Sequence, residues 1–374
     1  MALEFTAEQK LLQKTVREFA ENEIAPRIDE IVTAKDYIPR DMYQRMADLG
    51  FWRVLVPKEH GGLGLGITEA CIIHEELSKV APTLGLIAMC VMTTPPCLLA
   101  SKPATEKYLK GIMSGKLIAN GGVTAPQGHT NVNEWTPIAK KDGDYYILNG
   151  SHLYNTNNCV FDVHMVFGYD EDRNMLIWVV EDGMPGLDHS TYENKFGMKG
   201  SGGGTVTYKN VRVHKDMCFS AGVGNTMFYY QLYAICSSIG LGAAEGFFAK
   251  GIDWAKTRTN NFKPLTDKGF IRGKLAKMNT LLTISRTAIY DSASLLDGSP
   301  DRVDEGCLKA QMCKAYVPDA CMQVCQDLMK LFAGIAYHDV HYYHYIADIL
   351  STGIMDLPTD YQYEGIATLM GLNG

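Results

Sequence analysis

The spacing of apolar residues changes twice along the 374-residue chain. In the first part, apolar positions such as Val16 and Phe19 recur with the roughly 3.6-residue period of an α-helix. Thr6 and Gln9 precede this run with the spacing of a capping box, which marks the start of a helix. We therefore expect an N-terminal all-α domain over residues 1–117.

The period then falls to about two residues, which is the period of a half-buried strand. Runs of this kind occupy four segments: 145–148, 163–167, 175–180 and 206–213. Turn-forming residues separate them, as in Asp142-Gly143-Asp144. About a hundred residues of this pattern predict a small β-barrel or sandwich over residues 118–222.

Helical spacing returns near residue 224 and continues to the end of the chain. Four long amphipathic runs follow: 230–257, 267–296, 304–332 and 344–355. Short connections between them predict a four-helix bundle over residues 223–374. The expected fold class is therefore mainly α with a β insert, in which an N-terminal helical domain and a C-terminal four-helix bundle flank a middle small β-barrel.

Composition narrows the function only slightly. Hydrophobic residues make up 46% and charged residues 21% of the chain, which is ordinary for a globular protein. The net charge of -7 argues against a broad nucleic-acid surface. The N-terminus lacks a targeting pattern and no run approaches about 18 apolar residues, so we expect a cytoplasmic protein with no membrane partner.

Two groups of side chains have spacings found in metal sites. Cys321 and Cys325 would share one helical face, and His338, His341 and His344 are three residues apart. The ten cysteines of the chain are scattered among apolar neighbours, which is typical of reduced core thiols. Tyrosines interrupt the histidine group and favour an aromatic packing stripe, so we expect no metal.

The strongest candidate chemistry lies between Asn120 and Thr156. Residues 122–132 read GVTAPQGHTNV and residues 149–157 read NGSHLYNTN, and both segments are rich in Gly, Thr and Asn. Such segments allow the backbone to approach a flat polar ligand, although most of them are plain connectors.

In this order and spacing, the two segments resemble the flavin-contacting strands of the acyl-CoA dehydrogenase family. The resemblance extends to further motifs along the chain, at residues 57–66, 75–77, 200–213, 258–264, 332–334 and 363–365. It implies a flavoenzyme that binds FAD and acts on an acyl-CoA or enoyl-CoA, by dehydrogenation or by the reverse reduction. It further implies a homotetramer whose flavin is reoxidised by an electron-transferring flavoprotein. An oxygen-using acyl-CoA oxidase and a degenerate homologue that binds CoA thioesters without chemistry remain open alternatives.

The resemblance also assigns residues. Glu364, within Tyr363-Glu364-Gly365, is expected to be the catalytic base that removes the proton alpha to the thioester carbonyl. Neighbouring tyrosines would desolvate this carboxylate, and Tyr363, Gly365 and Thr130 would contact substrate. The cofactor-binding positions implied by the resemblance are Val123, Thr124, Thr130, Tyr154, Thr156, Arg258, Lys330 and Gly334. Of these, Arg258 and Lys330 match positions that reach the FAD of a neighbouring subunit.

Overall fold

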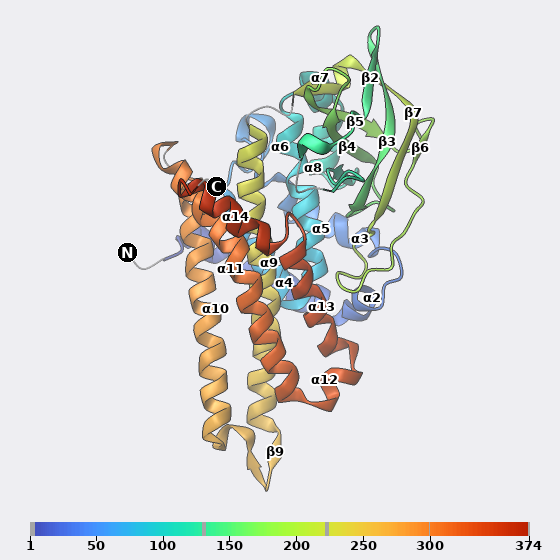
Figure 1. Cartoon of the computed structure of the whole chain (residues 1–374). Helices are drawn as coiled ribbons and strands as arrows, with labels where there is room; N and C mark the ends of the chain where they lie inside the picture. The colour runs from blue at the N-terminus through green and yellow to red at the C-terminus, as the bar shows by residue number, and fades with distance from the viewer. Residues whose placement is uncertain (1–3, 129–131, 221–223, 299, 373–374) are drawn as a thin grey trace.

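The computed structural model describes residues 4–128, 132–220, 224–298 and 300–372. Figure 1 shows the strands of residues 119–220 gathered at one end of the molecule and the long helices running away from them. The order of an all-α, an all-β and a second all-α region is confirmed. The last helix before the strands ends at Met113 and the first strand begins at Ala119.

The N-terminal region consists of short and medium helices. Their bounds are α1 (Ala7–Phe19), α2 (Ile28–Val32), α3 (Arg40–Asp48), α4 (Ile67–Val80), α5 (Pro82–Met92), α6 (Thr94–Leu98), α7 (Lys102–Ala104) and α8 (Lys110–Met113). The predicted capping box opens α1, because Thr6 N donates to Gln9 Oε1 at 2.9 Å and Gln9 N donates to Thr6 Oγ1 at 3.2 Å.

Two four-stranded sheets form the middle region. The first has the order β1 (Ala119–Gly122), β4 (Val163–Tyr169), β5 (Met175–Glu181) and β8 (Cys218–Ser220), and the second has the order β2 (Ala139–Asp142), β3 (Tyr145–Asn155), β7 (Gly204–His214) and β6 (Leu187–Asp188). All pairs are antiparallel except β1 with β4. Side chains such as Leu148 and Val206 from one sheet and Trp178 from the other share one apolar core, so the alternating pattern is explained by burial between the sheets.

The C-terminal region is built on four long helices and several short elements. The long helices are α9 (Gly224–Thr257), α10 (Gly269–Leu296), α11 (Val303–Phe332) and α13 (Val340–Ile354); the short elements are β9 (Thr259–Asn260), β10 (Lys263–Pro264), α12 (Gly334–His338) and α14 (Thr359–Leu369). The sequence pattern predicted the four long helices but not α14, which packs against α11.

Helix α9 joins the two helical regions into one body. Gly242 and Gly246 lie against the backbone of α4, where an added Cβ would come within 2.2 Å of Glu75 O and 1.9 Å of Lys79 O. Only glycine permits this approach. Within the described residues, one helical segment, Tyr230–Thr257, is long and apolar enough to cross a membrane, and 83% of its apolar window is buried inside the protein. Its apolar character is thus accounted for by packing.

A buried ionic cluster reinforces the same junction. Glu75 lies 2.6 Å from Arg286 of α10, and Glu76 lies 2.7 Å from Lys79 and 3.0 Å from Arg17 of α1. Both glutamates are buried; burial raises the pKa of Glu75 to about 7, whereas at Glu76 the effect of burial is outweighed by the hydrogen bond with Arg17 and the nearby Lys79, which hold its pKa below the usual value. The Glu75-Glu76 pair therefore has a structural role in tying α1, α4 and α10 together.

Candidate functional site

The two Gly- and Thr-rich segments lie side by side in the structure. Leu153 N donates to Thr124 O at 2.8 Å, and Asn120 Nδ2 donates to Thr156 O at 3.0 Å. Four of the predicted cofactor residues lie on these segments: Val123, Thr124, Tyr154 and Thr156. Thr130, predicted to contact both cofactor and substrate, lies outside the described residues.

Tyr154 presents an open aromatic side chain at this edge. The pairing of β3 with β7 is irregular between His152 and Asn155, and Tyr154 adopts φ 60° and is 69% exposed. A positive φ is strained for a tyrosine, and such strain is retained mainly where function requires it. Tyr154 therefore presents an exposed ring beside Thr156, and we refer to Tyr154, Thr124 and Thr156 together as the Tyr154 shelf.

A carboxylate with one enclosed oxygen lies just beyond α13. Asp356 and Leu357 adopt φ values of 52° and 86° in the turn before α14. The Oδ2 atom of Asp356 is enclosed and has no hydrogen-bond partner among the described residues. Burial raises the pKa of Asp356 to about 6, against the opposing charge of Lys314. The turn is held in place because Lys314 Nζ donates to Leu357 O at 2.9 Å.

Cys90 of α5 connects this carboxylate with the end of strand β3. Burial raises the pKa of the Cys90 thiol to about 12, the charge of Asp356 adds to the rise, and a hydrogen bond with Thr156 opposes it. Asp356 and Thr156 thus both act on the same thiol, and the sequence analysis did not identify Asp356.

The expected environment of Glu364 is not found. Glu364 is exposed on α14, and the two tyrosines beside it, Tyr361 and Tyr363, are 47% and 52% exposed. They cannot desolvate the carboxylate, so this expectation is wrong. Gly365 is explained by packing, since an added Cβ would lie 2.0 Å from Nε2 of Gln311 on α11.

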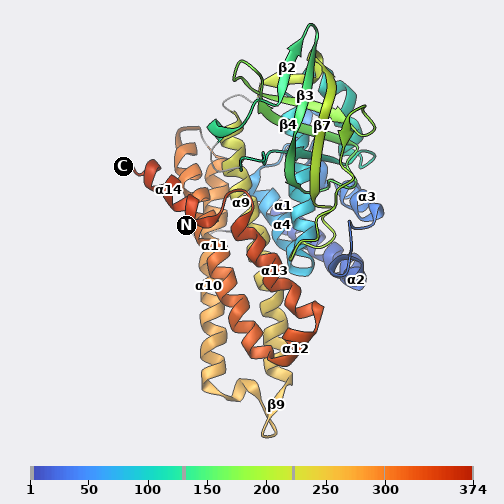
Figure 2. The ribbon, with the colours of Figure 1, turned by 45° about the vertical axis from the view of Figure 1, so that its right-hand side comes forward.

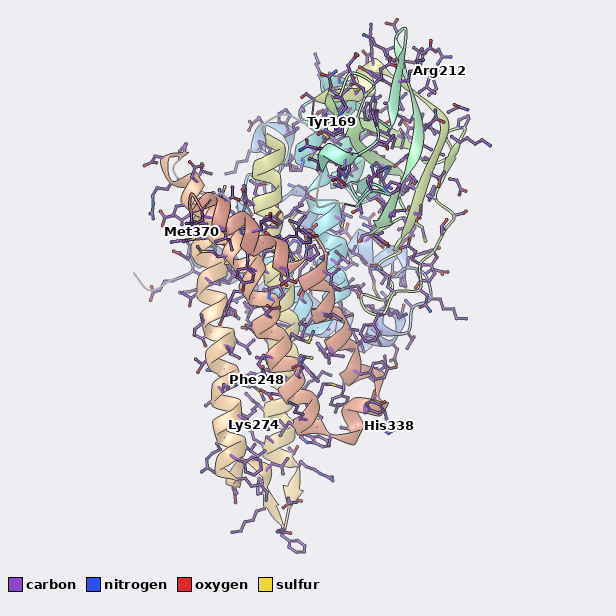
Figure 3. The ribbon with its side chains drawn as sticks, viewed as in Figure 1. Tyr169, Arg212, Phe248, Lys274, His338 and Met370 are labelled. Carbon is purple, nitrogen blue, oxygen red and sulfur yellow. The ribbon has the colours of Figure 1, made fainter. Side chains whose placement is uncertain are left out.

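The remaining predicted cofactor residues lie far from Thr156. Arg258 follows α9, Lys330 is near the end of α11, and Gly334 begins α12. Figure 1 and Figure 2 place β9 and α12 at the end of the bundle opposite the sheets. Figure 3 shows the same separation, with His338 at one end and Arg212 at the other. Within one chain these residues do not join the Tyr154 shelf, and their contact with a neighbouring subunit's cofactor stays a prediction.

The histidines of the metal-like group have other partners. His344 Nδ1 lies 2.9 Å from Asp348, and His341 Nε2 lies 3.2 Å from Asp29. In the part of the chain that the structure describes, no group of three or more His, Cys, Asp or Glu side chains could hold a metal ion. A cavity of about 440 Å³ lies beside this group, and Lys195 and Lys199 are on its wall. It contains none of the predicted cofactor residues that are described.

Comparison with known proteins identifies the protein family to which the chain belongs. Residues 6–116 match the N-terminal domain and residues 233–370 the C-terminal domain of acyl-CoA dehydrogenase. The chain is 30% identical to cyclohex-1-ene-1-carbonyl-CoA dehydrogenase of Syntrophus aciditrophicus, over 89% of this chain and 82% of that protein. It is 27% identical to 3-(aryl)acrylate reductase of Clostridium sporogenes and 26% identical to the caffeyl-CoA reductase-Etf complex subunit CarC of Acetobacterium woodii, each over 89% of this chain and 90% of the relative.

Solved structures agree on the fold. Butyryl-CoA dehydrogenase of Megasphaera elsdenii matches with a TM-score of 0.90 at 22% identity, over 99% of this chain and 100% of that one. The FAD complex of PigA matches with a TM-score of 0.90 at 20% identity, over all of both chains. The chain belongs to the acyl-CoA dehydrogenase family. The predicted oxidoreductase class, which acts on CH–CH groups, and the predicted cofactor FAD are thereby confirmed.

The residues at the shelf fit this cofactor. Tyr154 offers an exposed ring, and the polar residues Thr124 and Thr156 lie on the two segments next to it. An aromatic face flanked by polar groups suits a flat, partly polar ring system.

Proposed function

We propose that this chain interconverts a saturated and an α,β-unsaturated CoA thioester, with Asp356 as the group that takes and returns the alpha proton. The observation that carries this assignment is the enclosed, unpartnered Oδ2 of Asp356 at the end of the Thr156 strand. Glu364, exposed on α14, lacks this enclosure.

Bound FAD supplies the acceptor for the beta hydrogen, which leaves the substrate as hydride. Tyr154, Thr124 and Thr156 would hold the ring against the β domain. Asp356, with its pKa of about 6, is close to a working pH near neutrality, where a general acid or base is most efficient. It can accept the alpha proton in dehydrogenation and return it in reduction. Lys314 and the turn at Leu357 hold the carboxylate in place.

The test compares two substitutions that each remove one carboxylate and keep its shape. Asp356→Asn and Glu364→Gln proteins are loaded with FAD and mixed anaerobically with a panel of acyl-CoAs, while the flavin absorbance is followed. Asp356→Asn should retain FAD and lose flavin reduction by about 100-fold or more, the low end of general-base effects. Glu364→Gln should reduce its flavin at the wild-type rate. The opposite result would restore Glu364 as the base.

Electron transfer to a flavoprotein, rather than to oxygen, is supported by the relative named as a subunit of a caffeyl-CoA reductase-Etf complex. We expect the reduced protein to pass electrons to an added electron-transferring flavoprotein. Rapid peroxide formation in air without that partner would instead favour an oxidase. A purified protein that is colourless and takes up no FAD would favour a non-catalytic homologue.

A homotetramer would explain the distance between the Tyr154 shelf and Arg258. In that assembly, Arg258 and Lys330 of one subunit would approach the FAD phosphates of another, and cofactor binding would stabilise the assembly. Light scattering of the FAD-loaded protein should give the tetramer mass, and a monomer that holds FAD tightly would contradict this. We also propose a cytoplasmic location, which fractionation of the source cells would test.

A further inference from the structure

A line of four buried polar side chains runs behind the Thr156 strand. Asn120 of β1, His152 of β3, His164 of β4 and Tyr208 of β7 are all at most 2% exposed. His164 Nδ1 lies 2.6 Å from Asn120 Oδ1, and His164 Nε2 lies 2.6 Å from the Tyr208 hydroxyl. The line ends at Thr156, whose carbonyl accepts the Asn120 amide at 3.0 Å.

The contacts determine where each hydrogen lies. Because the Asn120 amide nitrogen donates to Thr156 O, its carbonyl oxygen faces His164 and must accept from Nδ1–H. Burial lowers the pKa of His164 well below its usual range, so this ring is neutral and carries one hydrogen. Nε2 of His164 is therefore an acceptor, and the Tyr208 hydroxyl donates to it.

The contact with His152 is the weak end of the line. Burial lowers the pKa of His152 to about 4, so this ring is also neutral. Because the Tyr208 hydrogen is directed at His164, His152 does not orient that hydrogen. The longer contact of 3.1 Å between His152 and Tyr208 agrees with this.

The line is tightly enclosed. A Cβ added at Gly122 would lie 2.9 Å from atoms of both His152 and His164, so no side chain fits between the strand and the rings. The peptide that follows Thr156 is also held on its other side, because Asn157 N donates to Ser201 O at 2.8 Å. Each donor and acceptor of this peptide thus has a buried partner.

We propose that Asn120, His164 and Tyr208 are positioning residues that fix the Thr156 peptide at the flavin edge and so set the affinity and reduction potential of the cofactor. This inference rests on the proposed function, which places FAD against Thr156. The order of contacts predicts that substitutions change the FAD affinity and reduction potential most at Asn120, less at Tyr208 and least at His152.

The experiment measures the FAD dissociation constant, the flavin midpoint potential and the visible flavin spectrum of Asn120→Ala, Tyr208→Phe and His152→Gln. Asn120→Ala leaves a buried carbonyl without a partner and should weaken FAD binding about tenfold, with shifts of potential and spectrum. Tyr208→Phe keeps the ring and the fold and should give shifts in the same direction of smaller size.

Tyr345→Phe is the matched control. Tyr345 is a buried tyrosine of α13 whose hydroxyl donates to Lys79 O at 3.3 Å, far along the chain from the line. The Tyr345→Phe variant should lose stability as Tyr208→Phe does, while its FAD affinity, midpoint potential and flavin spectrum stay at wild-type values.

The outcomes separate the two proposals. A yellow wild-type protein whose Asn120→Ala and Tyr208→Phe variants keep the wild-type FAD affinity and potential would overturn the positioning role alone. A wild-type protein that binds no FAD would overturn the proposed function and this role with it. If Asn120→Ala does not fold, the FAD affinity and midpoint potential of Tyr208→Phe alone test the positioning role. Nitrogen NMR shifts showing the Nε2–H form of His164 would also contradict the proposed hydrogen bonds from Tyr208 to His164 and from His164 to Asn120.

Discussion

Replacing Asp356 by Asn should make the protein more stable while removing its activity. The side chains are nearly the same size, but Asn carries no charge into the enclosed site. A pKa of about 6, compared with the usual 3.8, means that the fold disfavours the ionised carboxylate by about 3 kcal/mol. Part of this energy is offset because the Asn amide group also needs hydrogen-bond partners. We therefore expect the free energy of unfolding of Asp356→Asn to exceed that of wild type by about 1–3 kcal/mol at pH 7.

The gain should depend on pH in a defined direction. Since the folded-state pKa of Asp356 is raised, the protonated group favours folding below about pH 4, and this contribution is lost as the pH rises through about 6. The stability difference between Asp356→Asn and wild type should therefore be small near pH 4, grow up to about pH 6 and remain constant above it. Urea unfolding of both proteins across this range measures it.

Asp348→Asn serves as the control substitution. Asp348 is buried, and its carboxylate accepts the Met198 amide and pairs with His344 at 2.9 Å. Because this carboxylate has partners, Asp348→Asn should lose about 1–3 kcal/mol, the opposite sign. If Asp356→Asn also loses stability at pH 7, or if its difference from wild type does not change between pH 4 and 6, then Asp356 is not an unpaired enclosed carboxylate and its assignment as the base fails.

Three further substitutions test other parts of the structure. Gly365→Ala should destabilise the protein by about 1–3 kcal/mol, since the new Cβ would lie 2.0 Å from Gln311 Nε2; an unchanged urea midpoint would show that α14 does not pack as described. Ala333→Gly should stabilise the protein by about 1 kcal/mol, because Ala333 has φ 57° and ψ -131°, a conformation that strains any residue except glycine. Thermal unfolding measures this, and a lower midpoint for Ala333→Gly than for wild type would show that the strain is absent. Arg258→Ala should weaken FAD binding and Arg258→Lys should restore it only in part, because lysine lacks the planar fork of donors. Fluorescence of released flavin measures both, and wild-type retention in Arg258→Ala would remove Arg258 from the cofactor site.

Much of the fold could be predicted from the sequence because the relevant signals are local. The change of apolar spacing from a helical to a strand period near residue 119, and back near residue 224, follows from the geometry of each element. The start of α1 is another local signal, since Thr6 and Gln9 satisfy one another's groups within a single turn. The Thr124 and Thr156 segments were identified together from the sequence, through the motifs that resemble the flavin-contacting strands of the family.

The identity of the enclosed carboxylate was decided by tertiary structure. Asp356 and Glu364 are eight residues apart, and both have apolar or aromatic neighbours in the sequence. Whether a carboxylate is desolvated depends on which elements cover it, and here Lys314 of α11 and Cys90 of α5 lie near Asp356 while α14 leaves Glu364 in solvent. No local pattern carries this information. The line from Tyr208 through His164 and Asn120 has the same origin, because Asn120 and His164 meet only when β1 pairs with β4, and Tyr208 of β7 joins them only when the two sheets pack.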